Sequence, residues 1–178
     1  MSRRPIAAAD RPETSWQPDG ELLHGLILEA ILKGNPIPLA YRINYVANFY
    51  VGPLVAQMEK AHRLTRSEWI VLFCLNRQPR LNAQQIHIVT GRPKTSIATA
   101  VKLLQRKKLI TRKTDIADTR RRVLHLTDAG RALYKSIIDG FVARETDMLK
   151  CLDAGERREL LRVFDKIIKH AGTWAKPY

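Results

Sequence analysis

The strongest constraint on the fold is residues 81–126, which read as two short helices followed by a basic hairpin. Asn82 is a good helix N-cap, so we expect a helix over 83–90. Gly91 breaks the chain, and Pro93 suits the first position of a second helix, where its missing N–H leaves no hydrogen bond unmade. Two helices separated by so short a break predict a helix-turn-helix.

The second helix is expected to run to about Lys107 and to be amphipathic. Its apolar face has residues at i, i+4 and i+7, which are Ile97, Val101 and Leu104. Its other face has Lys94, Thr95, Ser96, Thr99 and Lys102. Residues 109–111 and 123–126 then alternate like the two arms of a hairpin, around a polar and charged turn. The sequence therefore predicts a winged helix-turn-helix.

The positive charge of the chain is concentrated in this same stretch. Residues 92–122 contain eleven basic side chains and two acidic ones, in a chain of formal net charge +14. A basic run is often only a solvated face. Here it falls on the exposed helix face and the hairpin tip, which are the two parts that meet DNA in this motif, so we favour double-stranded DNA as the partner.

Three segments resemble the multiple-antibiotic-resistance-regulator (MarR) family of transcriptional regulators. DTRRRVLHLTDAGRAL, from Asp118, is similar to the family's wing and following helix, with its Asp-x-Arg and Leu-Thr-x-x-Gly motifs at Asp118, Arg120, Leu126, Thr127 and Gly130. LTRSEWIVL from Leu64 resembles the family's second helix, and LLQRKKLI from Leu103 resembles the end of its recognition helix. Family members usually have Gly where Lys108 stands. The resemblance covers about residues 38–170.

Together these features predict a mainly α-helical protein in which residues 63–126 form a winged helix-turn-helix with a two-stranded β-wing. Residues 1–20 are rich in Pro, Arg and small residues, so we expect a disordered arm. The resemblance implies that the helical regions 21–62 and 127–172 form a dimerisation domain. In the last helix an apolar stripe of Leu160, Leu161, Val163, Phe164, Ile167 and Ile168 is expected to be buried. It fits an intramolecular core as easily as a dimer, and we favour a homodimer because two-fold DNA readers pair half-sites.

Local signals give the boundaries of the remaining helices. An amphipathic helix is expected over 21–33, ended by Gly34, and another over 39–62, with a kink where Pro53 removes a hydrogen bond. Thr65 and Glu68 form a capping box for a helix over 66–76. Leu81 is a candidate for a short strand against the wing. Thr127 should cap a helix to about Leu149, and Asp153 or Ala154 should begin the last helix.

The candidate DNA-binding residues lie on the two helices and the wing. They are Asn82, Gln84, Arg92, Lys94, Thr95, Ser96, Thr99, Lys102, Lys113, Arg120, Arg121 and Arg122. Hydroxyl side chains can contact base edges or phosphate, and Lys and Arg bind phosphate or guanine. Capping alone explains Asn82 about as well. The resemblance implies that Asp118 and Arg120 brace the hairpin tip, and arginines there would reach a narrow minor groove.

The resemblance also implies a small aromatic acid or phenol as effector, bound between the dimer helices and the DNA-binding domain. Such a ligand needs an apolar slot with a few polar groups and a cation. The candidates are Tyr41, Arg42, Tyr45, Asn48, Phe49, His62, Arg66 and Trp69. For each of these residues, ordinary core packing or solvent exposure is the competing interpretation.

Other functions have weaker support in the sequence. Cys74 and Cys151 show no pairing pattern, which fits a reducing cytosol; a redox-sensing regulator would most readily use Cys151. The five histidines are scattered, so we expect no metal site, and we expect no enzyme because catalytic motifs are missing. We also expect no cofactor, signal peptide or membrane span, and therefore a cytoplasmic, nucleoid-associated protein. The main alternative is a winged-helix protein that binds nucleic acid regardless of sequence.

Overall fold

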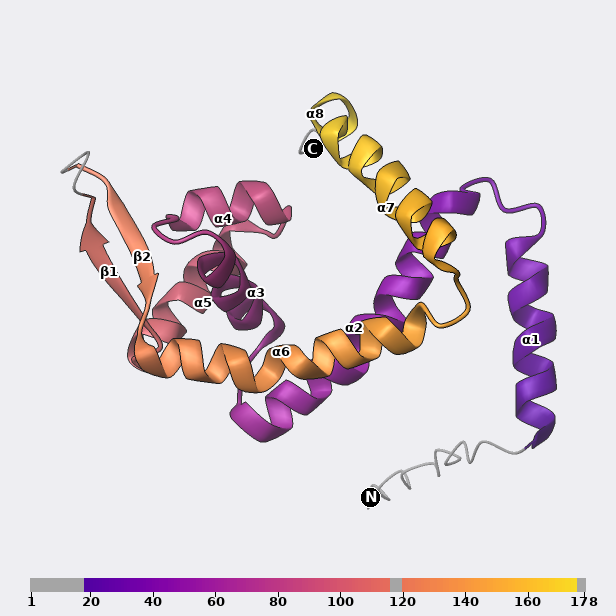
Figure 1. Cartoon of the computed structure of the whole chain (residues 1–178), viewed down its shortest axis with the longest axis horizontal. Coiled ribbons are helices and arrows are strands. Elements are labelled where there is room, and N and C mark those ends of the chain that lie inside the picture. The colour runs from indigo at the N-terminus through magenta and orange to yellow at the C-terminus, as the bar shows by residue number, and fades with distance from the viewer. Residues whose placement is uncertain (1–17, 116–119, 176–178) are drawn as a thin grey trace, which may run out of the picture. The chain divides into compact units, whose positions relative to one another are not determined.

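The computed structural model describes residues 18–115 and 120–175, which form helices and one two-stranded sheet (Figure 1). The elements are α1 (Pro18–Leu32), α2 (Pro38–His62), α3 (Arg66–Arg77), α4 (Ala83–Thr90), α5 (Lys94–Arg106), β1 (Ile110–Thr114), β2 (Arg122–Leu126), α6 (Asp128–Met148), α7 (Ala154–Lys169) and α8 (Ala171–Trp174). The chain divides into two compact units, one ending at Val46 and the other beginning at Ala47. The predicted mainly helical fold with a two-stranded wing is confirmed.

The first unit contains α1 and the beginning of α2. The predicted helix stop is confirmed, since α1 ends at Leu32 and Gly34 adopts a left-handed φ of 66°, which glycine takes without strain. Leu26 and Ile27 on α1 are 58% and 52% exposed. Leu26 and Ile27 are therefore not covered within the first unit.

The second unit is built around a core between α3, α4, α5, the sheet and α6. Its fully buried side chains include Leu64, Leu72, Ile86, Ile97, Leu104 and Val123. Both predicted caps are present: Thr65 and Glu68 form a capping box at α3, and Asn82 forms one with Gln85 at α4. Each satisfies backbone N–H groups that a helix start leaves unpaired. The cap residues thus set the starts of α3 and α4.

The turn between α4 and α5 differs from the prediction by one residue. Gly91 ends α4 in the left-handed conformation, as expected for a helix break. Pro93 is the N-cap of α5 rather than its first helical residue, because its ψ of 135° is extended. The recognition helix therefore begins at Lys94.

The wing is longer than predicted. β1 and β2 pair antiparallel from Ile110 opposite Leu126 to Thr114 opposite Arg122. The sequence misses this length because every β1 residue after Ile110 is exposed, so the strand has no alternation to recognise. The predicted strand at Leu81 is wrong: Leu81 lies outside the sheet and accepts one hydrogen bond, from the N–H of Leu124 (2.8 Å).

Helix α6 packs against α3 and the second half of α2 through aromatic rings. The ring of Trp69 stacks on those of Phe141 and Tyr134, at centroid distances of 4.7 and 5.5 Å. Arg144 donates to the carbonyl oxygens of Tyr50 (2.9 Å) and Phe49 (2.5 Å), which holds α2 to α6. The predicted kink of α2 at Pro53 stays a prediction, while the helix itself continues through that residue.

The apolar stripe on the last helix is not buried within its own unit, so its favoured burial in a homodimer stays a prediction. Asp153 caps α7 as expected, through a capping box with Glu156. However, α7 has no buried residue, and Leu161 and Ile168 are each 64% exposed. An apolar stripe left uncovered by its own chain needs another surface to cover it.

Candidate nucleic-acid interface

The first turns of α5 present hydroxyl and ammonium groups to solvent. Lys94, Thr95, Thr99 and Lys102 are exposed, and Ser96 is half-buried. No side chain caps the start of this helix. Its first N–H groups are therefore available to an anion, and the helix dipole adds a positive potential there.

A shallow hollow of about 350 Å³ lies beside this helix start. Its lining is Thr65, Ser67, Thr95, Ser96, Thr99, Ala100 and Leu103, so most of its side chains are hydroxylic. Thr65 and Ser67 belong to the start of α3, Thr95 and Ser96 to the start of α5, and the remaining residues follow along α5. Hydroxyls and helix N-termini in one hollow suit the oxygens of a phosphodiester backbone.

Two arginines flank the same region. Burial lowers the pKa of the Arg92 guanidinium, and the neighbouring positive charge of Arg66 lowers it further. His87 Nδ1 donates to the carbonyl oxygen of Arg92 (2.6 Å), which fixes the turn before α5. Arg66, predicted as an effector ligand, thus lies near the recognition helix and adds to its positive potential.

The two candidates at the start of α4 differ from each other. The Asn82 side-chain oxygen accepts the N–H of Gln85 (2.9 Å), so capping accounts for this residue. Gln84 is exposed and remains a candidate for phosphate contact. The start of α4 thus offers Gln84 as its more accessible polar side chain.

The wing presents basic side chains on both strands. Lys113, Arg120 and Arg122 are exposed, Arg121 is half-buried, and Arg122 donates to the Thr114 hydroxyl. Asp118, predicted to brace the hairpin tip, lies outside the described residues. The predicted Asp118–Arg120 brace therefore stays a prediction.

A different acid ties the wing to the body of the unit. Asp115 is 8% exposed, and its Oδ1 lies 2.5 Å from Nη2 of Arg80, in the segment between α3 and α4. The N–H of Asp115 donates to the Arg121 carbonyl oxygen (2.8 Å). Sequence reasoning missed this brace, although Asp115 is one of only two acids among residues 92–122.

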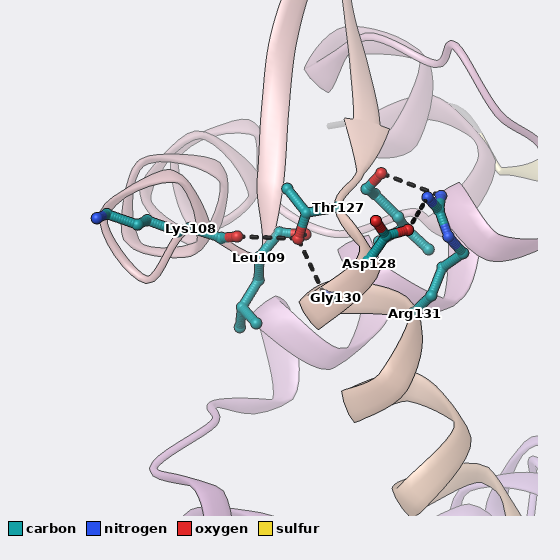
Figure 2. A network of polar contacts seen from close by, with 7 residues as sticks. Lys108, Leu109, Thr127, Asp128, Gly130 and Arg131 are labelled. Atoms are coloured by element: carbon teal, nitrogen blue, oxygen red, sulfur yellow. Dashed lines mark hydrogen bonds and ion pairs between the residues drawn. The ribbon is translucent and has the colours of Figure 1, made fainter.

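The exit of α5 is bound to the start of α6 by the Leu-Thr-x-x-Gly motif (Figure 2). The Thr127 hydroxyl caps α6 by accepting the N–H of Gly130 (3.0 Å), and it donates toward the carbonyl oxygens of Lys108 (2.9 Å) and Leu109 (3.0 Å). Gly130 is required by space, because a Cβ there would lie 2.1 Å from the Leu109 oxygen. The motif thus fixes where α6 leaves the wing.

Lys108, where the resembled family usually has Gly, adopts a φ of 58°. This left-handed conformation is costly for a residue with a Cβ and free for glycine. Lys108 therefore adopts at the helix exit a backbone conformation that glycine would adopt without strain.

The predicted effector residues are divided between the two units. Tyr41, Arg42 and Tyr45 belong to the first unit, where Arg42 donates to the Pro38 carbonyl oxygen (2.9 Å). In the second unit Asn48 and Phe49 are exposed, whereas Trp69 is 6% exposed and belongs to the core. The ordinary core interpretation therefore holds for Trp69.

His62 lines a hollow of about 150 Å³ between α2 and α6. The other lining residues are Leu54, Gln57, Met58, Ala61, Ser136, Ile137, Gly140 and Phe141. Apolar walls with an imidazole, an amide and a hydroxyl are the chemistry that a small aromatic ligand requires. Sequence reasoning missed Gln57 and Ser136, whose helical positions carry no signal of a shared hollow.

The remaining side-chain chemistry can be stated for the described residues alone. Burial raises the pKa of the half-buried Cys74 thiol, which disfavours its reactive thiolate, whereas Cys151 is exposed. Across residues 18–115 and 120–175, His, Cys, Asp and Glu side chains do not assemble in the groups of three that a metal site needs. In the same ranges, a helix with the length and apolarity required to span a bilayer is absent.

Comparison with known proteins agrees with this geometry. The MarR family model matches residues 63–121. Solved regulators with the same fold include S. aureus MepR, solved with DNA, at 22% identity and a TM-score of 0.66, where the match covers 76% of this chain and 98% of MepR. Streptomyces coelicolor PcaV, solved with its natural ligand, has 25% identity and a TM-score of 0.60, with 82% of this chain and 96% of PcaV covered. Bordetella bronchiseptica BpsR, whose DNA binding is regulated by 6-hydroxynicotinic acid, has 20% identity and a TM-score of 0.61, with 72% of this chain and 91% of BpsR covered. Residues 63–121 therefore match the MarR family model, and the described part of the chain has the fold of MarR-family transcriptional regulators.

Proposed function

We propose that this chain is a homodimeric transcriptional repressor that binds a pseudo-palindromic operator and releases it when a small aromatic acid binds. The observation that carries the proposal is the start of α5, where exposed Lys and Thr side chains surround a helix N-terminus that no side chain caps. This arrangement suits entry into a major groove, with the basic wing beside it.

Each group has a role in this proposal. Lys94, Thr95, Ser96 and Thr99 face base edges, and Arg92 with Lys102 binds the flanking phosphates. The hollow beside α5 adds Ser67 as a further phosphate contact, and Arg66, whose charge acts on Arg92, adds another. Arg120, Arg121 and Arg122 of the wing enter the adjacent minor groove.

The homodimer is supported by the uncovered apolar face of α7. Leu161, Ile168 and the α8 residue Trp174 are 64%, 64% and 65% exposed in the single chain. Covering such side chains with a second copy gives about 25 cal/mol per Å² buried. Two copies would also place two recognition helices for half-sites about 34–36 Å apart.

The hollow between α2 and α6 supports the effector part of the proposal. A cavity of about 150 Å³ is large enough for one benzene ring. His62 and Ser136 are suited to a carboxylate or phenol oxygen at its edge. PcaV with its natural ligand and BpsR with 6-hydroxynicotinic acid are precedents for ligand-responsive regulators of this fold.

Fluorescence anisotropy tests the DNA-binding part. Duplexes from upstream of the chain's own gene are compared with scrambled duplexes at about 0.15 M salt, together with a duplex enriched by the protein from genomic fragments. A regulator is expected to prefer its site by about 10³-fold or more. Equal binding to all duplexes would instead indicate a sequence-independent nucleic-acid binder.

A titration of the bound complex then tests the effector. Benzoate, salicylate and 6-hydroxynicotinate are added as probes, with cyclohexanecarboxylate as a control for the carboxylate alone. Release of the duplex by an aromatic acid but not by the control supports the proposal. Release that persists in His62→Ala and Ser136→Ala would exclude this hollow as the effector site.

A further inference from the structure

The residue that follows the recognition helix makes two contacts within the protein. Nζ of Lys107, the C-cap of α5, lies 2.7 Å from Oε1 of Glu68. The same Nζ donates to the carbonyl oxygen of Arg63 (2.7 Å). The Lys107 side chain is only 33% exposed, so its ammonium is directed into the protein.

Glu68 is a fully buried carboxylate, in which Oε2 is hydrogen-bonded and Oε1 has the ion pair with Lys107 in place of a hydrogen bond. Its Oε2 accepts the N–H of Thr65 (2.9 Å) in the capping box of α3, and its Oε1 pairs with Lys107. A buried carboxylate loses its hydration and is stable only when a cation and hydrogen bonds replace the water. Glu68 therefore joins the start of α3 to the end of α5.

Arg63 is the joint between α2 and α3. Its φ of 50° is unusual for a residue with a Cβ, so the chain bends sharply there. The N–H of Arg63 donates to the backbone carbonyl oxygen of Glu59 (3.0 Å), and the N–H of Leu64 donates to the backbone carbonyl oxygen of Met58 (3.4 Å). The last turn of α2, which includes the hollow-lining Met58 and His62, is thereby continuous with this joint.

We propose that Lys107 is a positioning residue, which fixes the exit of the recognition helix to the α2–α3 joint through the Arg63 carbonyl and Glu68. A displacement of the last turn of α2 then moves α5 on the DNA. This inference rests on the proposed DNA-binding function and adds the path from the hollow to the recognition helix.

The same ammonium could otherwise be an ordinary phosphate contact, and the two roles predict different salt dependence. Removal of a phosphate contact reduces the magnitude of the slope of log K against log salt concentration by about one. Removal of a positioning residue lowers the affinity for DNA at every salt concentration and does not change that slope. Residues that act on coupling without touching a ligand commonly change affinity by about 2- to 30-fold.

The central variant is the double substitution Glu68→Gln with Lys107→Met, in the full-length protein. It removes both charges together, so the net charge stays the same and no buried carboxylate is left unpaired. Affinity is measured for the best duplex that wild type selects from a random pool, over a salt series. We expect about tenfold weaker binding with an unchanged salt slope.

Three further variants make the test specific. Lys102→Met is the positive control for a phosphate contact and should lower the salt slope by about one. Lys108→Met removes a neighbouring exposed charge, and we expect less than about a twofold loss of affinity. Lys107→Arg keeps a cation with several donors and should retain most of the wild-type affinity.

Glu68→Gln alone keeps the test decisive if the double variant does not fold. Because Glu68 is fully buried, its side chain cannot touch DNA. The glutamine amide of the variant still has an oxygen that can accept the N–H of Thr65 in the cap. We expect about threefold weaker binding by a protein that melts cooperatively.

The outcomes separate the two proposals. Wild-type affinity in Glu68→Gln and in the double variant would overturn the positioning role and leave the regulator intact. A slope lowered by about one in the double variant would make Lys107 a phosphate contact and also overturn it. If wild type selects no preferred duplex, the proposed function fails and the positioning role fails with it.

Discussion

The two ends of helix α5 are built for different purposes. At its exit, Lys107 contacts Glu68 and Arg63, and the next two carbonyl oxygens contact Thr127. At its start, no side chain caps the helix, and Lys94, Thr95 and Thr99 are exposed. The polar groups at the exit bind neighbouring segments of the protein, whereas those at the start are exposed to solvent and can bind a partner.

This difference shows how one short helix can be both rigid and accessible. Polar groups engaged inside a protein fix geometry, and polar groups left at a helix start attract anions. Substitutions at the exit should therefore change stability first, and substitutions at the start should change DNA affinity alone. The following predictions test that separation, from the largest expected effect to the smallest.

Gly130→Ala should cause the largest loss of stability, about 3 kcal/mol, because its Cβ would overlap the Leu109 carbonyl oxygen. Gly140→Ala in the same helix is the matched control, since its Cβ would meet only Leu54 at 3.8 Å. That control should be neutral or more stable by about 0.5–1 kcal/mol. Urea denaturation followed by circular dichroism measures both, and equal effects would contradict the close approach of α6 to the exit.

Arg120→Ala should weaken operator binding by about 1–3 kcal/mol, because it removes an exposed basic side chain of the wing. Arg158→Ala removes the same charge from an exposed position on α7, outside the wing, and serves as control. Anisotropy titrations at matched salt compare the two variants. Wild-type affinity in Arg120→Ala would remove the wing from the DNA interface.

Thr95→Val should weaken operator binding by about 1 kcal/mol, because it removes one hydroxyl contact and keeps the shape of the side chain. Its effect on unfolding should be within about 0.5 kcal/mol, since the side chain is exposed. Thr173→Val in α8 is the control for an exposed helical threonine away from the interface. A stability loss larger than the affinity loss would contradict the assignment of the α5 start to binding.

Lys108→Gly should stabilise the protein by up to about 1 kcal/mol, because glycine adopts the left-handed φ of this position without strain. Arg106→Gly, two residues earlier and still helical, should destabilise it by about 1 kcal/mol. Opposite signs for two glycine substitutions so close together are the expected signature of the helix exit. The same sign for both would show that the exit is not left-handed in solution.

Much of this fold could be predicted from the sequence because its signals are local. Asn82, Thr65 and Thr127 are caps whose partners lie three residues away, so the helix starts follow from spacing alone. Asp115 and Glu68 show the opposite case, since their partners Arg80 and Lys107 lie 35 and 39 positions away. No periodicity reveals such pairs. The length of β1 could not be predicted either, because its residues after Ile110 are all exposed and do not alternate.

The candidate sites divide in the same way. The exposed face of α5 could be predicted because Ile97, Val101 and Leu104 mark the buried face and leave the rest outside. The effector residues could not, because aromatic side chains fit a core as well as a pocket, and Trp69 is core. The hollow at His62 depends on how α2 packs on α6, which a single chain pattern does not encode.

Hydrogen–deuterium exchange with and without the selected duplex tests the comparison of the two ends most directly. We expect the duplex to slow exchange at residues 92–99 and 120–122. Exchange at residues 107–109 should not change, because their hydrogen bonds already lie within the protein. A scrambled duplex at the same concentration is the control and should protect neither end. Protection at residues 107–109 without protection at residues 92–99 would contradict the assignment of the α5 start to DNA.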